Sequence, residues 1–212
     1  MELAILTIFC TSFLVALSGA LMPGPLLTVT ISESTRRGAM TGPLLIFGHS
    51  ILELALVTLL ISGLAPFFVR NDVFIFISYV GGAMLLFMGV SMLRALSGLT
   101  MVREGEQTQS RSLVLAGVIL SAINPYFLIW WGSIGTGYII HSLQFGILGV
   151  IAFFSGHIIA DLAWYSFISF AIAKGRHLFN DRVYKKLIGG CAIFLILFSG
   201  WFFYSGTLKM IS

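Results

Sequence analysis

The chain has 212 residues, of which 58% are hydrophobic and only 9% are charged, and its formal net charge is +4. Polar residues are too few to cover a water-soluble globule of this size, so we expect an all-α integral membrane protein. The basic residues do not form a single stripe, which argues against a nucleic-acid-binding protein.

The first predicted transmembrane helix, residues 3–21, runs into a strong helix breaker. The segment Met22-Pro23-Gly24-Pro25 interrupts the apolar pattern, which then resumes. Two prolines and a glycine free several backbone groups. Within a bilayer these are tolerated only where they pack against protein or line a wet cavity. Pro23, Gly24 and Pro25 are therefore predicted to shape a binding site.

The second predicted helix, residues 41–62, carries two ionisable side chains near its centre. His49 and Glu53 are four residues apart and lie on one helical face. Ionisable groups are costly inside a bilayer, and there they mark substrate, ion or proton sites. Glycines in the predicted spans, among them Gly48 and Gly190, are expected to let helices approach closely.

The third predicted helix, residues 73–93, completes a first unit of three helices, residues 1–96. Residues 97–112 are polar and are predicted to form a cytoplasmic linker. The remaining residues, 113–212, form a second unit of three helices in the same membrane domain.

The fourth predicted helix, residues 113–132, contains a second breaker, Asn124-Pro125. Matching interruptions in corresponding positions of two halves indicate a transport site, so Asn124 and Pro125 are predicted to shape the same site as the first break. The following Trp130 and Trp131 could line the substrate route or act as bulky anchors facing lipid.

The fifth predicted helix, residues 145–171, repeats the pattern of the second. A glycine, a histidine and an acid recur as Gly156, His157 and Asp161, with His157 and Asp161 again four residues apart. This duplication favours a functional role for the His and acid pairs.

The sixth predicted helix, residues 187–206, also has a counterpart in the first unit. Its glycine pair, Gly189 and Gly190, matches Gly81 and Gly82 in the third helix at the same spacing. Three helices per repeat is an odd number, so the second copy must enter the membrane from the opposite side. The sequence therefore predicts six transmembrane helices as an inverted 3+3 repeat with interrupted helices 1 and 4, a plan typical of secondary transporters.

The basic residues fall in alternate loops. Ten of the twelve Lys and Arg residues follow helices 1, 3 and 5, whereas Arg70 and Lys209 lie on the other side. By the positive-inside rule, the three basic loops face the cytoplasm and both termini face outward. We expect a multi-pass protein of the inner (cytoplasmic) membrane.

The duplicated His and acid residues have several interpretations. Glu53 and Asp161 could carry protons or hold a substrate ammonium group, with His49 and His157 tuning them. Each pair could instead be a neutral, structural hydrogen-bonded pair. Two histidines and two carboxylates are also suitable ligands for zinc, manganese or iron. No metal site is predicted, because nothing in the sequence places the two helices side by side.

In length, layout and two motifs the chain resembles the LysE/RhtB family of amino-acid exporters. The motifs are a Met-Pro-Gly-Pro segment in helix 1 and an Asn-Pro in helix 4, here Met22 to Pro25 and Asn124-Pro125. The resemblance implies proton-driven export of amino acids or related small zwitterions. We expect alternating access by rocking one half against the other.

The expected function is thus that of a secondary transporter and not of an enzyme. The alternatives are a divalent metal-ion exporter that uses the paired His and carboxylate groups, and a membrane thiol-disulfide carrier that uses Cys10 and Cys191. The expected partners are an amino-acid substrate, the lipid bilayer and, as a further option, a second copy of the chain. Neither a cofactor nor a nucleic acid is expected.

Overall fold

The computed structural model describes residues 1–68, 70–98, 112–175 and 181–211, and these are almost entirely helical. The predicted linker, residues 97–112, lies largely outside the described residues. The first part of the chain forms α1 (Glu2–Ala20), α2 (Pro25–Arg37), α3 (Thr41–Leu59), α4 (Ala65–Phe68) and α5 (Asn71–Ala95). The second part forms α6 (Leu113–Ala122), α7 (Pro125–Trp130), α8 (Thr136–Leu143), α9 (Gly146–Gly175) and α10 (Asp181–Ile211). Two π-helical turns, η1 (Leu60–Leu64) and η3 (Trp131–Gly135), follow α3 and α7, and a 3-10 turn, η2 (Leu96–Gly98), follows α5.

Within the described residues, 5 helices are long and apolar enough to cross a membrane. They correspond to the predicted spans 1, 2, 3, 5 and 6, and comprise Glu2–Ala20, Thr41–Phe67, Asn71–Gly98, Gly146–Gly175 and Lys185–Ile211. Even the shortest, with 19 residues, extends about 28 Å at 1.5 Å per residue, close to the thickness of the hydrocarbon core.

The fourth predicted span differs from the expectation of one interrupted helix over residues 113–132. It is divided into α6, α7, η3 and α8 and continues to Leu143. The cause lies in its sequence, because Pro125 cannot continue α6 and the following turn adopts a wider π-helical path. The described residues therefore show five helices of membrane-spanning length, the second with a non-helical residue at Gly63, and a segmented apolar stretch where the fourth span is predicted. The inverted relation of the two halves stays a prediction.

Both predicted helix breaks are present, and in each the proline begins a new helix. Gly24 is the extended N-cap residue of α2, with Pro25 in its first turn. Asn124 is the N-cap residue of α7, with Pro125 in its first turn. Proline suits this position because it has no amide hydrogen, and the first amides of a helix have no partner within it.

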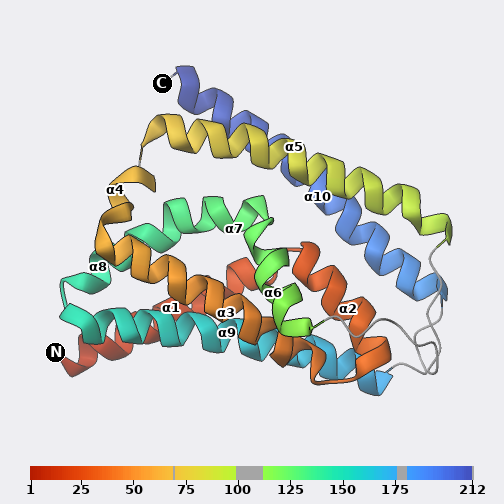
Figure 1. Cartoon of the computed structure of the whole chain (residues 1–212), viewed down its shortest axis with the longest axis horizontal. Coiled ribbons are helices and arrows are strands. Elements are labelled where there is room, and N and C mark those ends of the chain that lie inside the picture. Colours follow the sequence, from red (N-terminus) through yellow and green to blue (C-terminus); the bar gives the residue numbers. More distant parts are fainter. Residues whose placement is uncertain (69, 99–111, 176–180, 212) are drawn as a thin grey trace.

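The helices form two groups with the segmented elements between them. In Figure 1, α1, α3 and α9 lie together, α5 and α10 run side by side along the opposite edge, and α6 and α7 lie between the groups. The principal helix pairs are α1 with α9, α3 with α6, and α5 with α10. Each of these pairs joins a helix of the first half to a helix of the second.

Glycines allow the closest of these contacts. A Cβ added at Gly48 would lie 1.9 Å from the carbonyl oxygen of Val114 on α6, and one added at Gly156 would lie 2.4 Å from that of Phe9 on α1. The expectation of close helix approach is therefore confirmed at Gly48. It is wrong at Gly190, where an added Cβ would meet nothing within 4 Å.

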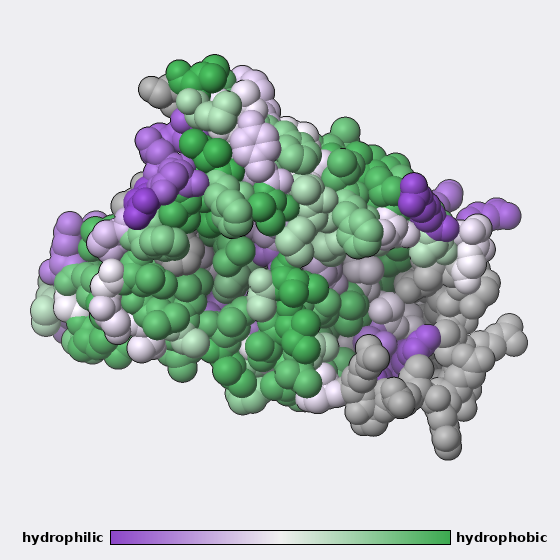
Figure 2. Space-filling model, turned by 45° about the horizontal axis from the view of Figure 1, so that its top comes forward, coloured by the Kyte–Doolittle hydropathy of each residue, from purple (hydrophilic) through white to green (hydrophobic). Residues whose placement is uncertain are grey.

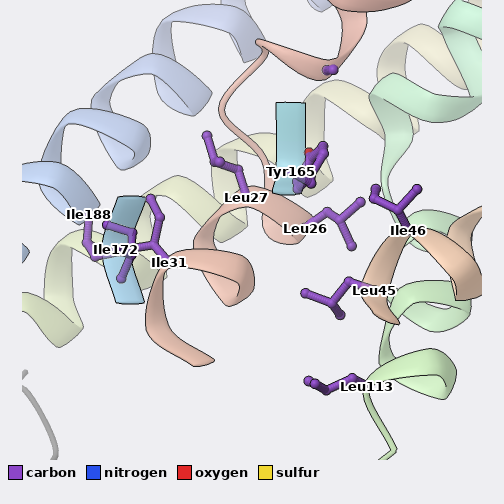
Figure 3. Close-up of a cluster of buried hydrophobic side chains, with 10 residues drawn as sticks. Leu26, Leu27, Ile31, Leu45, Ile46, Leu113, Tyr165, Ile172 and Ile188 are labelled. Atoms are coloured by element: carbon purple, nitrogen blue, oxygen red, sulfur yellow. The ribbon is translucent and has the colours of Figure 1, made fainter. Parts of the chain in front are cut away.

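The short helix α2 is held by a buried apolar cluster (Figure 3). Its side chains Leu26, Leu27 and Ile31 pack with apolar residues from α3, α6, α9 and α10. Those partners include Leu45, Ile46, Leu113, Tyr165, Ile172 and Ile188. This packing fixes the N-terminus of α2 against α3 and α9, the two helices that carry the His and acid pairs.

The outer surface is that of a multi-pass membrane protein. Figure 2 shows broad apolar areas, with hydrophilic side chains gathered towards opposite ends of the molecule. The ends of α2, α5 and α9 and the start of α10, which carry basic residues, lie at one end, and both chain termini lie at the other (Figure 1). This arrangement agrees with a shared side for the basic loops, whereas the side that faces the cytoplasm stays a prediction.

Candidate functional site

The two predicted His and acid pairs meet at the contact between α3 and α9. His49 and Glu53 lie on α3, and His157 and Asp161 lie on α9, with all four side chains buried. Because the members of each pair are four residues apart, each helix presents both of its side chains to the other. We call these four residues the His/acid quartet.

Each imidazole of the quartet contacts both carboxylates. The Nε2 atoms of His49 and His157 each lie 3.0 Å from Glu53 Oε1 and 3.4 Å from Asp161 Oδ2. The pairs are therefore not two separate structural pairs, one in each half. They form one network in which every acid is shared between the two histidines.

Glu53 is the most enclosed member, with 1% of its surface exposed. Its Oε1 atom also accepts a hydrogen bond of 3.0 Å from Trp131 Nε1, so three nitrogens surround one oxygen. Its Oε2 atom is buried and has no hydrogen-bond partner among the described residues. Such a buried, unsatisfied oxygen can take a proton, a water molecule or a ligand group.

Ser121 bonds to the outer nitrogen of His49. The Ser121 hydroxyl lies 2.6 Å from His49 Nδ1 and 2.7 Å from the carbonyl oxygen of Gly117. It has one hydrogen, so it either donates to Gly117 and accepts from Nδ1–H, or donates to an unprotonated Nδ1. In both cases the ring is held with Nε2 facing the two carboxylates.

His157 is held differently. Its Nδ1 atom is buried without a hydrogen-bond partner among the described residues. Its ring packs instead among aromatic rings, with centroids 4.7 Å from Trp130, 5.5 Å from Trp131 and 6.0 Å from Phe153. The two histidines are equivalent in the sequence repeat but unequal in their hydrogen bonding.

Both helix breaks border the same small cavity as the quartet. The cavity has a volume of about 70 Å³, and its lining includes Gly24, Asn124 and all four quartet residues. The two breaks also face each other, since a Cβ added at Gly24 would lie 3.6 Å from Asn124 Nδ2. The structure thus brings the predicted breaks and the predicted ionisable groups into one site.

The prolines take a supporting position. Pro25 and Pro125 are buried at the starts of α2 and α7, Pro23 is half-buried, and none of the three lines the cavity. They act through the backbone, by ending one helix and starting the next.

Several lining residues had no role in the sequence prediction. Ser121 stands four residues before Pro125, and Tyr126 and Phe127 follow it, all lining the cavity. Trp130 and Trp131 also line it and are buried, so they are not anchors that face lipid. A hydroxyl or an aromatic ring is common in apolar helices, so only the adjacent break could have drawn attention to these residues.

The Asn124 side chain is expected to stabilise the second break. Its Oδ1 accepts from the backbone amide of Tyr126 at 3.1 Å. Asn124→Ala removes this N-cap and should lower stability by about 1 kcal/mol, which corresponds to a Tm about 2–4 °C lower in detergent. Asn124→Ser retains a capping oxygen and serves as the control. Equal Tm values for Asn124→Ala and the wild type would contradict the role of the cap.

A cavity bordered by broken helices and buried ionisable groups, within a bundle of membrane-spanning helices, is the arrangement of a membrane transporter. A comparison with protein families agrees with this class. The chain belongs to the LysE type translocator family, whose model matches residues 17–206. This confirms the resemblance seen in the sequence, and it is in keeping with a function other than catalysis. No curated protein and no solved structure matches the chain.

Proposed function

We propose that this protein exports small amino acids or related zwitterions across the cytoplasmic membrane and couples their export to protons. The observation that carries this proposal is the single cavity that both helix breaks and the His/acid quartet line. Helix ends supply partial charges for the substrate, and the quartet supplies groups that exchange protons.

A zwitterion fits the charges around this cavity. The N-terminus of α2, which begins at Pro25 beside the cavity, carries partial positive charge and unpaired amides suited to a carboxylate. Glu53 and Asp161 are suited to an ammonium group. Amino acids present both groups on one carbon, so the two features can bind opposite ends of the same solute.

The size of the cavity favours small substrates. A volume of about 70 Å³ is only about twice the roughly 30 Å³ that one water molecule takes up in the liquid. Glycine and alanine, the smallest amino acids, would enter with the least rearrangement. A larger side chain would require the aromatic wall formed by Phe127, Trp130 and Trp131 to move.

We expect proton coupling because the four side chains of the quartet are close enough to exchange protons with one another. Two carboxylates and two imidazoles compete for a small number of protons at distances of 3.0 and 3.4 Å. A substrate ammonium group that approaches Glu53 or Asp161 would displace a proton from this network, and proton return would release the substrate.

We also propose that the two halves form an inverted repeat with both termini outside. In support of this, Gly48 of α3 packs against α6, and its counterpart Gly156 of α9 packs against α1. Each repeated helix thus contacts the interrupted helix of the other half. Cysteine labelling at Glu2 and at Arg36 in intact cells tests the orientation, with access expected at Glu2 only.

The thiol-disulfide alternative loses support. Cys10 is exposed on α1, Cys191 is buried on α10, and neither lines the cavity. The site therefore presents no thiol to a substrate among its described residues.

The function is tested by efflux from cells loaded with a panel of dipeptides that are hydrolysed inside. Glycine, alanine and similar amino acids should leave faster from wild-type cells than from cells with Glu53→Gln. Glu2→Gln, which alters an exposed acid at the start of α1, should behave like the wild type. If no amino acid leaves wild-type cells faster than it leaves Glu53→Gln cells, the proposed function is wrong.

Ser121 is expected to position His49. Ser121→Ala leaves the buried Nδ1 of His49 without its hydrogen-bond partner, which should cost about 1–3 kcal/mol and slow efflux. Ser121→Thr keeps the hydroxyl and should restore both stability and efflux. The measurement is the efflux rate per folded protein together with its pH profile. An unchanged rate and profile in Ser121→Ala would show that Ser121 has no positioning role.

A further inference from the structure

We propose that the His/acid quartet is a binding site for a divalent transition-metal ion such as Zn²⁺, and that a bound ion blocks transport. The ligands would be Nε2 of His49 and of His157 and one oxygen each of Glu53 and Asp161. The binding site stands on its own geometry, whereas the block rests on the proposed function.

The four donor atoms are close enough together to surround one ion. One donor atom per residue can be chosen so that all four lie within 4.8 Å of one another. Ligands at the usual bond lengths to zinc are separated by about 3.4 Å along a tetrahedral edge. The four His to acid separations are 3.0 or 3.4 Å and already match this value, and the separations between the two histidines and between the two acids would adjust when an ion binds.

The surroundings of the quartet also suit a metal ion. A histidine ligand commonly donates its other ring N–H to a nearby acceptor. With an ion on Nε2, His49 would do so through Nδ1 to Ser121, whose hydroxyl is also 2.7 Å from the carbonyl oxygen of Gly117. Glu53 Oε2 is buried and unpartnered and offers a second oxygen.

The charge balance of the quartet also favours binding of a divalent ion. Two ionised carboxylates carry two negative charges in a buried site, which is costly unless matching positive charge is present. Two protonated imidazoles supply that charge, and so does one divalent ion with two neutral imidazoles. The ion therefore competes directly with the protons of the quartet.

A metal ion in this site is better suited to inhibition than to transport. Four protein ligands close the coordination shell, as in structural zinc sites, whereas a transported ion must be bound weakly enough to leave. The ligands come from α3 and α9, so the ion would tie these helices together. It would also exclude the ammonium group of a substrate from Glu53 and Asp161.

Binding can be tested on the purified full-length protein in detergent with Co²⁺ as the spectroscopic probe. We expect one Co²⁺ per chain with the visible absorption of a four-coordinate ion, displaced by Zn²⁺. Asp161→Asn and His157→Ala should lose this spectrum, and Ser121→Ala should weaken affinity about 10- to 100-fold. His141→Ala, which removes a histidine of α8 outside the quartet, should bind like the wild type.

If folded wild-type protein lacks the Co²⁺ spectrum, or if Asp161→Asn retains it, the quartet is not a metal-binding site. The block is tested in proteoliposomes, where Zn²⁺ should stop amino-acid efflux by the wild type. If amino-acid efflux continues when the protein is loaded with Zn²⁺, the ion does not block transport. Passage of Zn²⁺ itself across the membrane would also contradict the proposed block. If no amino acid is exported at all, the proposed function fails, but the spectroscopic result still decides whether the metal site exists.

Discussion

Replacing Glu53 by Gln is expected to abolish proton-coupled efflux while the protein stays folded. Gln has nearly the same shape, and its amide oxygen can still accept from Trp131 Nε1, which lies 3.0 Å from Glu53 Oε1. It cannot take up or release a proton, and it removes one negative charge from the quartet. Transport driven by a pH gradient should fall by about 100-fold or more, the lower range for a positioned proton-transfer group.

Asp161→Asn is expected to act in the same direction, because Asp161 shares both histidines with Glu53. Efflux and counterflow in proteoliposomes separate proton coupling from substrate binding. A variant that exchanges substrate but ignores the pH gradient has lost only coupling. If a Glu53→Gln, Asp161→Asn double variant shows gradient-driven efflux at the wild-type rate, the quartet takes no part in proton coupling.

Adding one methyl group at Gly48 is expected to be the most damaging small substitution. In Gly48→Ala the new Cβ would lie 1.9 Å from the carbonyl oxygen of Val114, and a backbone atom cannot turn aside as a side chain can. Helices α3 and α6 must separate, at an expected cost of about 3 kcal/mol or more. This corresponds to a Tm about 6–12 °C lower in detergent.

Gly190→Ala is the matched control for this prediction. It lies within α10, and its added Cβ would meet nothing within 4 Å. Since alanine is the better helix former, Tm should stay the same or rise slightly. Similar Tm losses for Gly48→Ala and Gly190→Ala would show that the close backbone contact at Gly48 is not the cause of the loss.

Much of the site could be predicted because its residues are unusual in an apolar chain. Prolines and buried acids are costly in membrane helices, and their repetition in two halves made His49, Glu53, His157 and Asp161 conspicuous. Five of the six predicted spans follow from apolar length alone. The residues that complete the network, Ser121 and Trp131, could not be assigned, since their roles depend on three-dimensional contacts.

The fourth span shows what apolar length does not reveal. Residues 113–132 are predicted to form one helix with one break, yet residues 113–143 form three helices and a π-helical turn. The proline at position 125 indicates the first interruption. The second is the π-helical turn at Trp131–Gly135, where Trp131 donates to Glu53 and its carbonyl oxygen accepts from Thr136, and these contacts are not visible in the local sequence.

The close glycine contacts have a consequence for how the molecule can move. Gly48 joins α3 to α6, Gly156 joins α9 to α1, and Gly89 brings α5 against α10, so each of these three contacts crosses from one half of the sequence to the other. Rocking one half against the other, as expected from the repeat, would open all of these contacts at once. We therefore expect any movement to keep the body of α1, α3, α6 and α9 together and to displace the α5 and α10 pair, which contacts the rest of the molecule through Gly81 on α5 and Pro125 at the start of α7.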